Sequence, residues 1–515
     1  MSALVAQLGV AAVSMIIGWI GLWPSRKQLG TLTYHLVAMP VGLLAWPIGG
    51  SFSTWRERPF DAITAGVGAV LLIVGLWVIQ RLTARSEDAP SSAVSPLSFV
   101  VALGVLLTSG AVFTALRFTA TNNDSVMSYW PLGTALFRDG TFTANLISVR
   151  ALLIPSLNAG HVIFGSQWAY AIYSLFALNL VIYVAVSLLS GPLKIASKGV
   201  RIGITTAVVL FLVTEPSFLF HSVFVHSHMI TALYLMLALG ELWTAVSPVG
   251  ERAGRSPLNA HLVVAGLSAA GLALARPDGL AYVFVPIAVA ISLLTRHRVE
   301  LRSAAAFFAP MLYVVYGSFL GAFLGLGMWS SGKLGALIAS IILFALGLSA
   351  AGPWVMQWLD TKLPFRVTGD RFLVVGTFTG LAMLVAVCIL RWETAKLAAL
   401  NASVNLFGGE GGYWYLWYAV VALLVVSVIT RDATRPGTWT HPAFLAIMLF
   451  VLGLAIVHSA GHSGRVGVGD SLNRVVFHIL PLIAWYAGAI AARIFSEPLA
   501  HAEPELAAEP VPSVS

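Results

Sequence analysis

Charged residues are scarce in this chain, where they make up 10% of 515 residues, against about 25% in a typical soluble domain. Hydrophobic residues make up 58%, so most of the surface must face lipid. Cysteine is nearly absent as well, because Cys388 is the only one and lies in an apolar run. This excludes disulfides and cysteine-cluster metal sites within the chain. The first apolar run, at 4–23, lacks a charged start and an A-x-A-like exit, so we expect no cleavable signal peptide.

Apolar runs, in contrast, are abundant, and each is long enough to cross about 30 Å of hydrocarbon. They predict an all-α, polytopic transmembrane helix bundle of about 13 to 15 spans. The expected spans lie near 3–23, 34–50, 62–80, 97–116, 168–190, 202–214, 228–246, 260–275, 280–294, 303–324, 334–351, 371–390, 414–430, 443–457 and 475–494.

The spacing of these spans leaves no room for a separate soluble domain, because no stretch between them exceeds about 50 residues. We divide the chain into an N-terminal three-span extension (1–96), a core with an outer loop at 117–167 (97–390), C-terminal spans with outer loops (391–494) and a tail (495–515). The Ala/Glu/Pro-rich composition of the tail predicts disorder.

The net charge of +8 comes from short loops and does not indicate a nucleic-acid partner. If spans alternate, 18 of the 29 Lys and Arg residues fall in one set of loops. This excess assigns that set to the cytoplasm. We therefore expect a multi-pass protein of the plasma (inner) membrane, with the N-terminus outside and the tail inside.

The loops on the predicted outer side carry the unusual chemistry. They lie at 117–167, 215–228, 276–279, 391–413 and 458–474. Seven of the twelve histidines fall on or near this side, namely His161, His221, His226, His228, His458, His462 and His478. We therefore expect the outer face to be the working face.

The longest loop, 117–167, places Asp124 only seven residues after Arg117. A carboxylate so close to the end of a span would lie near the headgroup level. There it can act as a general base toward an acceptor hydroxyl, which typically contributes about 10²–10⁴ in rate. The alternative is that Asp124 only caps the helix that follows, because N-N-D-S is a good N-cap sequence.

A second segment, 215–228, gathers Glu215, His221, His226 and His228 just beyond a span. His226 and His228 would diverge on a helix, whereas His221 and His228 would align on one. The spacing fits no established metal pattern, so we favour phosphate contact or hydrogen bonding over a three-histidine metal site. A plainer interpretation is interfacial histidines satisfied by the backbone.

Arg276-Pro277-Asp278-Gly279 interrupts an otherwise apolar stretch, since Pro and Gly together break helices. Charge near a membrane interface is costly when unmatched and tends to be functional. We expect Arg276 to hold a phosphate or Asp278 to orient it, although an ordinary hairpin with an ion pair fits as well. Glu241, near the cytoplasmic end of a predicted span, is expected to reach the interface by snorkelling.

The last outer loop is rich in glycine and carries Arg465 and Arg474. Arg474 begins a span, where a guanidinium can reach the interface and bind a phosphate through two parallel hydrogen bonds. His478 is expected one turn deeper. The alternative is that Arg474 only anchors the span.

In this order the segments resemble the GT-C superfamily, the membrane glycosyltransferases that use polyprenyl-phosphate sugars. The likeness is carried by an acid followed by an amphipathic helix (124–142), P-S-F-L-F-H-S at 216–222, R-P-D-G at 276–279 and N-R-x-x-x-H-x-x-P at 473–481. It covers roughly 97–294 and 458–494.

The resemblance implies a GT-C-like fold and an inverting transfer from a polyprenyl-phosphate sugar to a hydroxyl of a glycan, lipid or protein in the cell envelope. Asp124 would be the base, and Arg276, Arg474 and a histidine of 221–228 would neutralise the leaving phosphate. The chain departs from the pattern because four spans, not one, precede the acidic loop. A single acid follows Arg117 where many members have an acidic pair. This weakens the expectation of a divalent metal, and no other cofactor is implied. It also leaves open a non-catalytic member.

Two other classes stay open. A transporter or flippase of a lipid-linked or anionic substrate also uses broken helices with charges in the membrane, although the chain shows no repeat between halves and its charges gather at one face. A non-catalytic subunit of an envelope-assembly complex would use the outer charges as contacts. Asp124→Asn should abolish a transferase and spare the other two.

Overall fold

The computed structural model describes residues 3–84, 94–116, 129–140, 151–166, 169–194, 196–224, 226–246, 258–276, 279–295, 300–325, 333–362, 369–411, 417–418, 421–422 and 471–500. Within these ranges the chain is all-α, and no β-strand is among the elements. The predicted fold class is therefore confirmed at the level of a polytopic helical bundle.

The first half of the chain forms α1 (Ala3–Leu22), η1 (Trp23–Ser25), α2 (Arg26–Leu29), α3 (Thr31–Gly42), α4 (Ala45–Trp55), α5 (Ala62–Thr83), α6 (Pro96–Leu116), α7 (Trp130–Asp139), α9 (Leu153–Ile163), α10 (Ala171–Ser190), α11 (Lys198–Thr214), α12 (Pro216–Val223) and α13 (Ser227–Val246). The second half forms α14 (Asn259–Ala275), α15 (Gly279–Tyr282), α16 (Phe284–Thr295), α17 (Leu301–Gly325), α18 (Lys333–Ser349), α19 (Gly352–Lys362), α20 (Gly369–Leu390), α21 (Trp392–Phe407), α24 (Ser471–Phe477) and α25 (Leu480–Ala500).

Seven helical stretches in the described part are long and apolar enough to cross a membrane, or up to nine if each bent pair counts as one span. Each predicted span within the described residues coincides with a helix, whereas those near 414–430 and 443–457 lie outside these residues. The number is lower than 13 to 15 because only the described residues are counted and because three of the predicted spans correspond to shorter apolar helices, at 259–275, 284–295 and 480–492.

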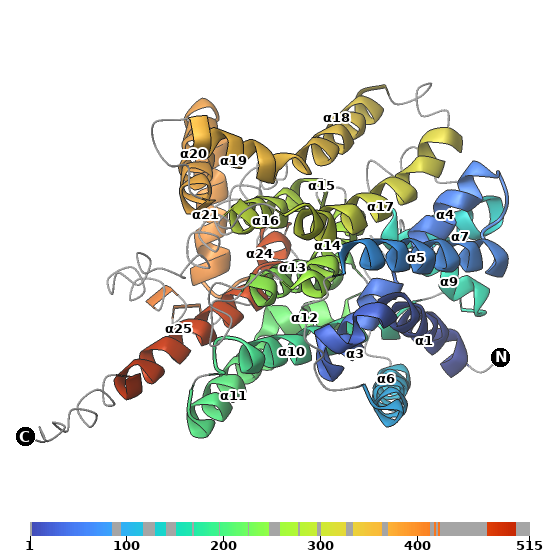
Figure 1. Cartoon of the computed structure of the whole chain (residues 1–515), viewed down its shortest axis with the longest axis horizontal. Coiled ribbons are helices and arrows are strands. Elements are labelled where there is room, and N and C mark those ends of the chain that lie inside the picture. Colours follow the sequence, from blue (N-terminus) through green and yellow to red (C-terminus); the bar gives the residue numbers. More distant parts are fainter. Residues whose placement is uncertain are drawn as a thin grey trace, which may run out of the picture.

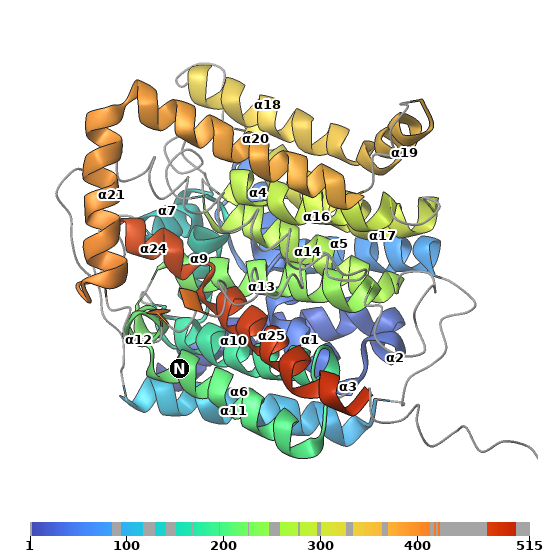
Figure 2. The ribbon, with the colours of Figure 1, turned by 90° about the vertical axis from the view of Figure 1, so that its left-hand side faces the viewer.

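The long helices run side by side, and the short elements gather at the two ends of the bundle (Figures 1 and 2). Figure 2 shows α7, α12, α21 and α24 at one end and α2 and α19 at the other. Elements predicted to belong to outer loops thus share one end. We call this end the histidine end, after the cluster described below.

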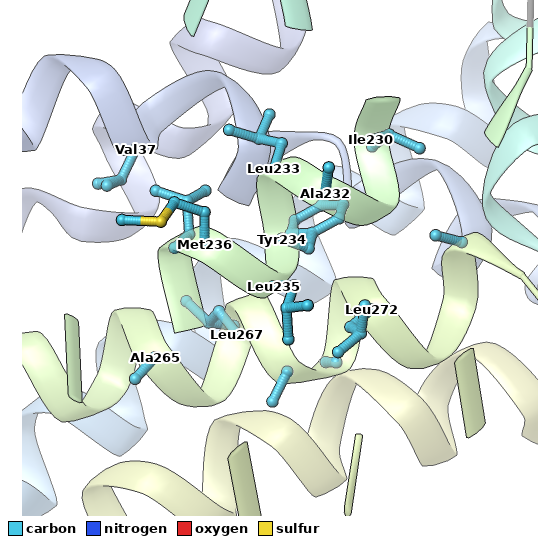
Figure 3. Packing of buried hydrophobic residues seen from close by; sticks show 14 of the residues in the cluster. Val37, Ile230, Ala232, Leu233, Tyr234, Leu235, Met236, Ala265, Leu267 and Leu272 are labelled. Atoms are coloured by element: carbon cyan, nitrogen blue, oxygen red, sulfur yellow. The ribbon is translucent and has the colours of Figure 1, made fainter. Parts of the chain in front are cut away.

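Helices α13 and α14 form the centre of the bundle, and every residue of α14 is buried. Figure 3 shows side chains of α13, among them Leu235 and Met236, beside Leu267 and Leu272 of α14. Lipid tails are as apolar as leucine, so such helices associate through close van der Waals packing and interhelical hydrogen bonds. This buried pair positions the polar groups at both of its ends.

Close approach of helices is clearest between α1 and α3. A Cβ atom on Gly18 would lie 1.8 Å from Ala38 O, and one on Gly42 would lie 1.7 Å from Ser14 O. Only glycine allows the two backbones to touch in this way.

In α3, Pro40 lacks an N–H, which leaves Leu36 O without its helical partner. Asn179 of α10 donates Nδ2–H to that oxygen at 2.9 Å, so the carbonyl is satisfied inside the membrane.

Helices α5 and α6 are the least buried of the seven candidate spans in the described part, with 22% and 6% of their apolar segments buried. The start of α5 is fixed by a capping box, in which Asp61 Oδ1 accepts from Thr64 N (2.8 Å) and Asp61 N donates to Thr64 Oγ1 (2.9 Å). At the histidine end, α7 forms within the predicted amphipathic segment. Its residues Trp130, Gly133 and Leu136 are buried.

Candidate functional site

Three helix breaks meet at the histidine end and bring together residues that are far apart in the sequence. The start of α13 supplies His226, just before the helix, and His228, in its first turn; Arg276 directly follows α14; Arg474 lies on α24, and His478 lies between α24 and α25. We call these five residues the histidine–arginine cluster. Its three histidines are buried, and its two arginines are partly buried.

His226 and His228 stack with ring centroids 4.0 Å apart and an interplanar angle of 21°. Two positions apart on a helix they would diverge, but α13 begins only at Ser227, so His226 lies outside the helix. His221 and His228 likewise do not share a helix, because α12 ends at Val223. Their rings nevertheless lie 5.3 Å apart.

The contact between His226 and Arg474 joins two hydrogen-bond donors. Ser227 N–H donates to His226 Nδ1 (3.0 Å), so in the neutral imidazole the proton lies on Nε2. That Nε2 lies 3.3 Å from Arg474 Nη1. Two N–H groups that face each other at this distance are suited to share one acceptor, such as an oxygen of a phosphate.

A chain of ring contacts extends from His228 deeper into the bundle. Arg276 Nη1 lies 2.8 Å from His228 Nδ1 and 3.1 Å from its Nε2. His228 Nδ1 is also 2.8 Å from His478 Nε2, and His478 Nδ1 is 3.1 Å from Tyr282 OH. Arg276 and Arg474 thus contact adjacent, stacked imidazoles. Their positive charges therefore lie at one place, where they favour an anion.

The wall beside His226 is formed by elements that lie within the predicted outer loop, 117–167. Tyr129 OH lies 3.1 Å from Ser227 Oγ, and Asn158 Nδ2 of α9 donates to Tyr129 O at 3.0 Å. The Tyr129 ring meets the His226 ring edge-on at 5.6 Å. Asp124 lies outside the described residues, five positions before Tyr129.

His221 is buried beside the cluster and packs on Phe477 with ring centroids 4.3 Å apart. Neither of its ring nitrogens has a hydrogen-bond partner among the described residues. Glu215 is also buried, at the break where the α11 and α12 axes bend by 64°. Two further predicted residues, Asp278 and Arg465, lie outside the described residues.

The described part of the chain contains no group of three or more His, Cys, Asp or Glu residues placed to hold a metal ion. The contacts of the cluster are instead those of paired donors and stacked rings. Tyr129 and Tyr282 are the residues that the sequence did not single out for the site. Tyr282 lies six residues after Arg276, on the short helix α15 that follows the R-P-D-G break. Its closeness to the break in the sequence is the signal that could have pointed to it.

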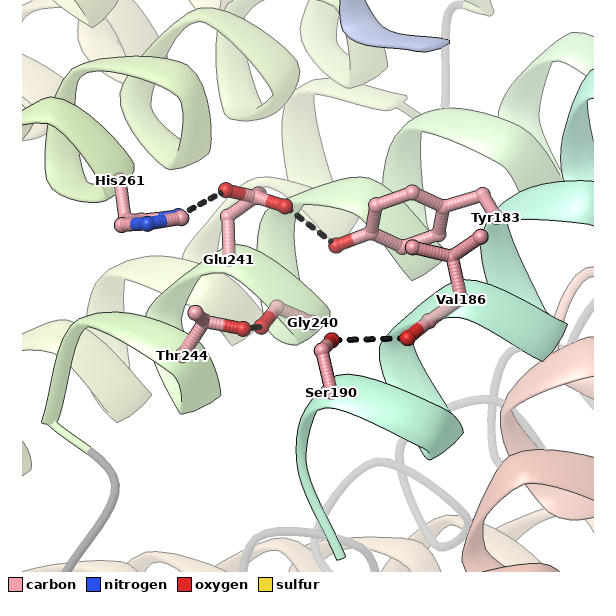
Figure 4. Close-up of polar contacts among 7 residues, drawn as sticks. All are labelled: Tyr183, Val186, Ser190, Gly240, Glu241, Thr244 and His261. Carbon is pink, nitrogen blue, oxygen red and sulfur yellow. Dashed lines mark hydrogen bonds and ion pairs between the residues drawn. The ribbon is translucent and has the colours of Figure 1, made fainter. Parts of the chain in front are cut away.

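A second polar group lies inside the bundle and corrects the expectation for Glu241 (Figure 4). Glu241 is 2% exposed, so it does not snorkel to the interface. Tyr183 OH donates to its Oε1 at 2.7 Å, and His261 Nδ1 lies 2.6 Å from its Oε2. The sequence prediction was wrong because hydropathy reports the position along a span, and not whether a neighbouring helix offers a partner. Glu241 lies 13 residues after His228 on α13, about 20 Å along the helix.

Comparison with protein-family models, with characterised proteins and with solved structures finds no match to this chain. The class that can be stated is a polytopic helical membrane protein with seven to nine candidate spans in its described part.

Proposed function

We propose that this protein is an inverting membrane glycosyltransferase that moves a sugar from a polyprenyl-phosphate carrier to an acceptor hydroxyl at the non-cytoplasmic membrane face. The observation that carries the proposal is the histidine–arginine cluster. It joins Arg276 and Arg474 through stacked imidazoles at the end of the bundle that holds the predicted outer-loop elements.

The cluster supports a role in binding a phosphate. Guanidinium groups bind phosphate oxygens through short, charge-assisted hydrogen bonds. Imidazole N–H groups, such as that of His226, add donors without adding a full charge. A lipid-borne phosphate that enters sideways between helices would reach these groups with its polyprenyl chain still in the membrane.

In the proposed reaction the acceptor oxygen attacks the anomeric carbon on the face opposite the phosphate, so the configuration inverts. The bond from the anomeric carbon to the phosphate oxygen breaks, and its electron pair remains on the leaving polyprenyl phosphate. Asp124 takes the proton of the acceptor hydroxyl. Negative charge grows on the leaving phosphate, where Arg276 and Arg474 stabilise it in the transition state.

The test uses purified protein, radiolabelled polyprenyl-phosphate sugars and envelope acceptors. Asp124→Asn should lower transfer by about 10²–10⁴, and Arg276→Gln by about 10²–10³. Arg138→Gln is the matched control, because Arg138 is an exposed arginine on α7 at the same end of the bundle. Equal label transfer by all four proteins, or a loss with Arg138→Gln as large as with Arg276→Gln, would contradict the proposal.

One observation favours a second candidate, a proton-coupled transporter. Glu241, Tyr183 and His261 form a buried polar group inside the bundle, and ionisable residues inside a membrane often mark proton relays. A transporter should lose substrate flux into proteoliposomes on Glu241→Gln and keep it on Asp124→Asn. A transferase should show the opposite pattern in the transfer assay.

A further inference from the structure

We infer that the protein holds an anionic phospholipid in a cavity between η1, α2, α5 and α14. The cavity lies where α14 begins, whereas Arg276 follows the end of that helix. Helix α14 has 17 residues, so at 1.5 Å per residue the two sites are about 25 Å apart. The inference therefore stands independently of the proposed transferase.

The cavity has a volume of about 510 Å³, enough for a headgroup and the first part of an acyl chain. Its polar lining is formed by Ser25, Gln28, Gln80, Arg81, Thr83 and Asn259. Among the described residues that line it, none is acidic. Basic pockets between membrane helices are sites where anionic lipid headgroups bind.

Positive charge is concentrated around the opening. Arg81 lines the cavity, and Arg26 and Lys27 lie on α2, the element that supplies Gln28. Arg26 is held over the Trp23 ring, 4.0 Å from its centroid, and donates Nη1–H to Trp23 O at 2.8 Å. Arg26 itself does not line the cavity, but it lies in the sequence between Ser25 and Gln28, which do. Arg81 is the cation in the wall, and a phosphodiester is the chemistry that fits it.

The opposite wall is apolar and faces the bilayer. The cavity is lined on this side by Val74, Trp77 and Val78, which are exposed along α5. Only 22% of the apolar part of this helix is buried. Trp77 Nε1 donates to Ile20 O at 2.7 Å, which fixes the ring between α5 and α1. A free phosphate would gain nothing from such a wall, whereas an acyl chain would lie along it. The occupant is therefore a lipid.

Gln80 lines the cavity and is held in place by two backbone carbonyls. It is 3% exposed, and its Nε2 donates to Gly21 O (2.7 Å) and Leu76 O (3.0 Å). Its Oε1 is itself buried, so Arg81 is the group of this wall that can recognise a headgroup. Phosphatidylglycerol carries a net negative charge and phosphatidylcholine carries none, so these two lipids separate the effect of charge.

The lipid would also brace the surrounding helices. Asn259 Nδ2 donates to Thr83 O of α5 (2.6 Å), and Asn259 Oδ1 accepts from Ser303 Oγ of α17 (3.1 Å). Asn259 thus joins three helices at the floor of the cavity. Occupation of the cavity should therefore raise the thermal stability of the protein in detergent by mass action.

The first test is native mass spectrometry of the full chain titrated with phosphatidylglycerol or phosphatidylcholine. We expect phosphatidylglycerol to be retained more tightly, and Arg81→Gln to weaken its binding by roughly tenfold or more. Arg81→Lys should keep part of the affinity. Arg56→Gln is the matched control, because Arg56 is an exposed arginine near the exposed Trp55 ring and does not line the cavity. Equal affinity of wild type and Arg81→Gln would overturn the inference.

The second test needs no variant, and so does not depend on how Arg81→Gln folds. Wild-type protein in nanodiscs is cross-linked to phosphatidylglycerol that carries a photoreactive group near its headgroup, and the labelled peptides are mapped. Label should concentrate on 74–84 and 259–263. Helix α6 is the internal comparison, because it faces lipid even more than α5 does. Equal labelling of 96–116 would show an ordinary lipid shell and refute a specific site.

Discussion

Replacing Glu241 by leucine should destabilise the protein strongly while leaving its surface unchanged. The substitution removes the acceptor of the Tyr183 hydroxyl and the partner of His261 Nδ1, bonds of 2.7 and 2.6 Å. Tyr183 is 1% exposed and His261 5%, so neither group can turn to water instead. Each buried polar group left unsatisfied costs about 1–3 kcal/mol. Breaking a buried pair typically costs about 3–5 kcal/mol.

A lower value has to be considered, because hydrogen bonds between membrane helices average only about 0.6 kcal/mol in double-mutant cycles. That average applies when the unfolded chain in the membrane finds other partners. Here one carboxyl group serves two buried partners on two other helices, α10 and α14. We therefore expect a loss of about 3 kcal/mol for Glu241→Leu, and less for Glu241→Gln, which keeps an acceptor for Tyr183.

The assay is unfolding by SDS titration of purified protein in mixed micelles, followed by circular dichroism. Glu393→Leu is the matched control, since Glu393 is an exposed glutamate in the first turn of α21. The double variant Glu241→Leu/His261→Leu should recover part of the loss, because it leaves fewer groups unsatisfied. If Glu241→Leu unfolds at the same SDS fraction as Glu393→Leu, the argument from buried partners is refuted.

Two further predictions concern stability. Gly42→Ala should weaken the contact between α1 and α3 by about 1–3 kcal/mol, since the new Cβ would meet Ser14 O. Gly66→Ala is the control and should not destabilise the protein, because nothing lies within 4 Å of a Cβ atom at that position. Equal unfolding of the two variants would contradict this prediction. Burial lowers the pKa of His161 from 6.5 to about 4, so the folded state resists protonation of this ring. The free energy of unfolding should therefore be highest above pH 6.5 and fall by about 3 kcal/mol as the pH drops toward 4. His161→Gln should lose less stability over that range in thermal unfolding, and an unchanged pH slope would rule out His161 as the cause.

The sequence predicted the helices well, because apolar runs of membrane length determine them locally. The cluster was harder to predict. Helical periodicity indicated that His226 and His228 would diverge, and the stacking of their rings depends on α13 beginning at Ser227. The contact between His228 and His478 joins residues 250 positions apart, and no local pattern encodes such a pair. Glu241 was misplaced for the same reason, since its partners come from other helices.

The separation of the two polar groups makes the two candidate functions distinguishable by one further measurement. His228 and Glu241 lie on the same buried helix about 20 Å apart, and sites that far apart with no shared partner usually contribute additively. In a transferase, Arg276→Gln should therefore lower label transfer by the same factor in wild type and in a Glu241→Gln background. In a proton-coupled transporter both groups would serve one transport cycle, so the second substitution should add little to the first. Additive losses of transfer would favour the glycosyltransferase, and strong non-additivity of flux would favour the transporter.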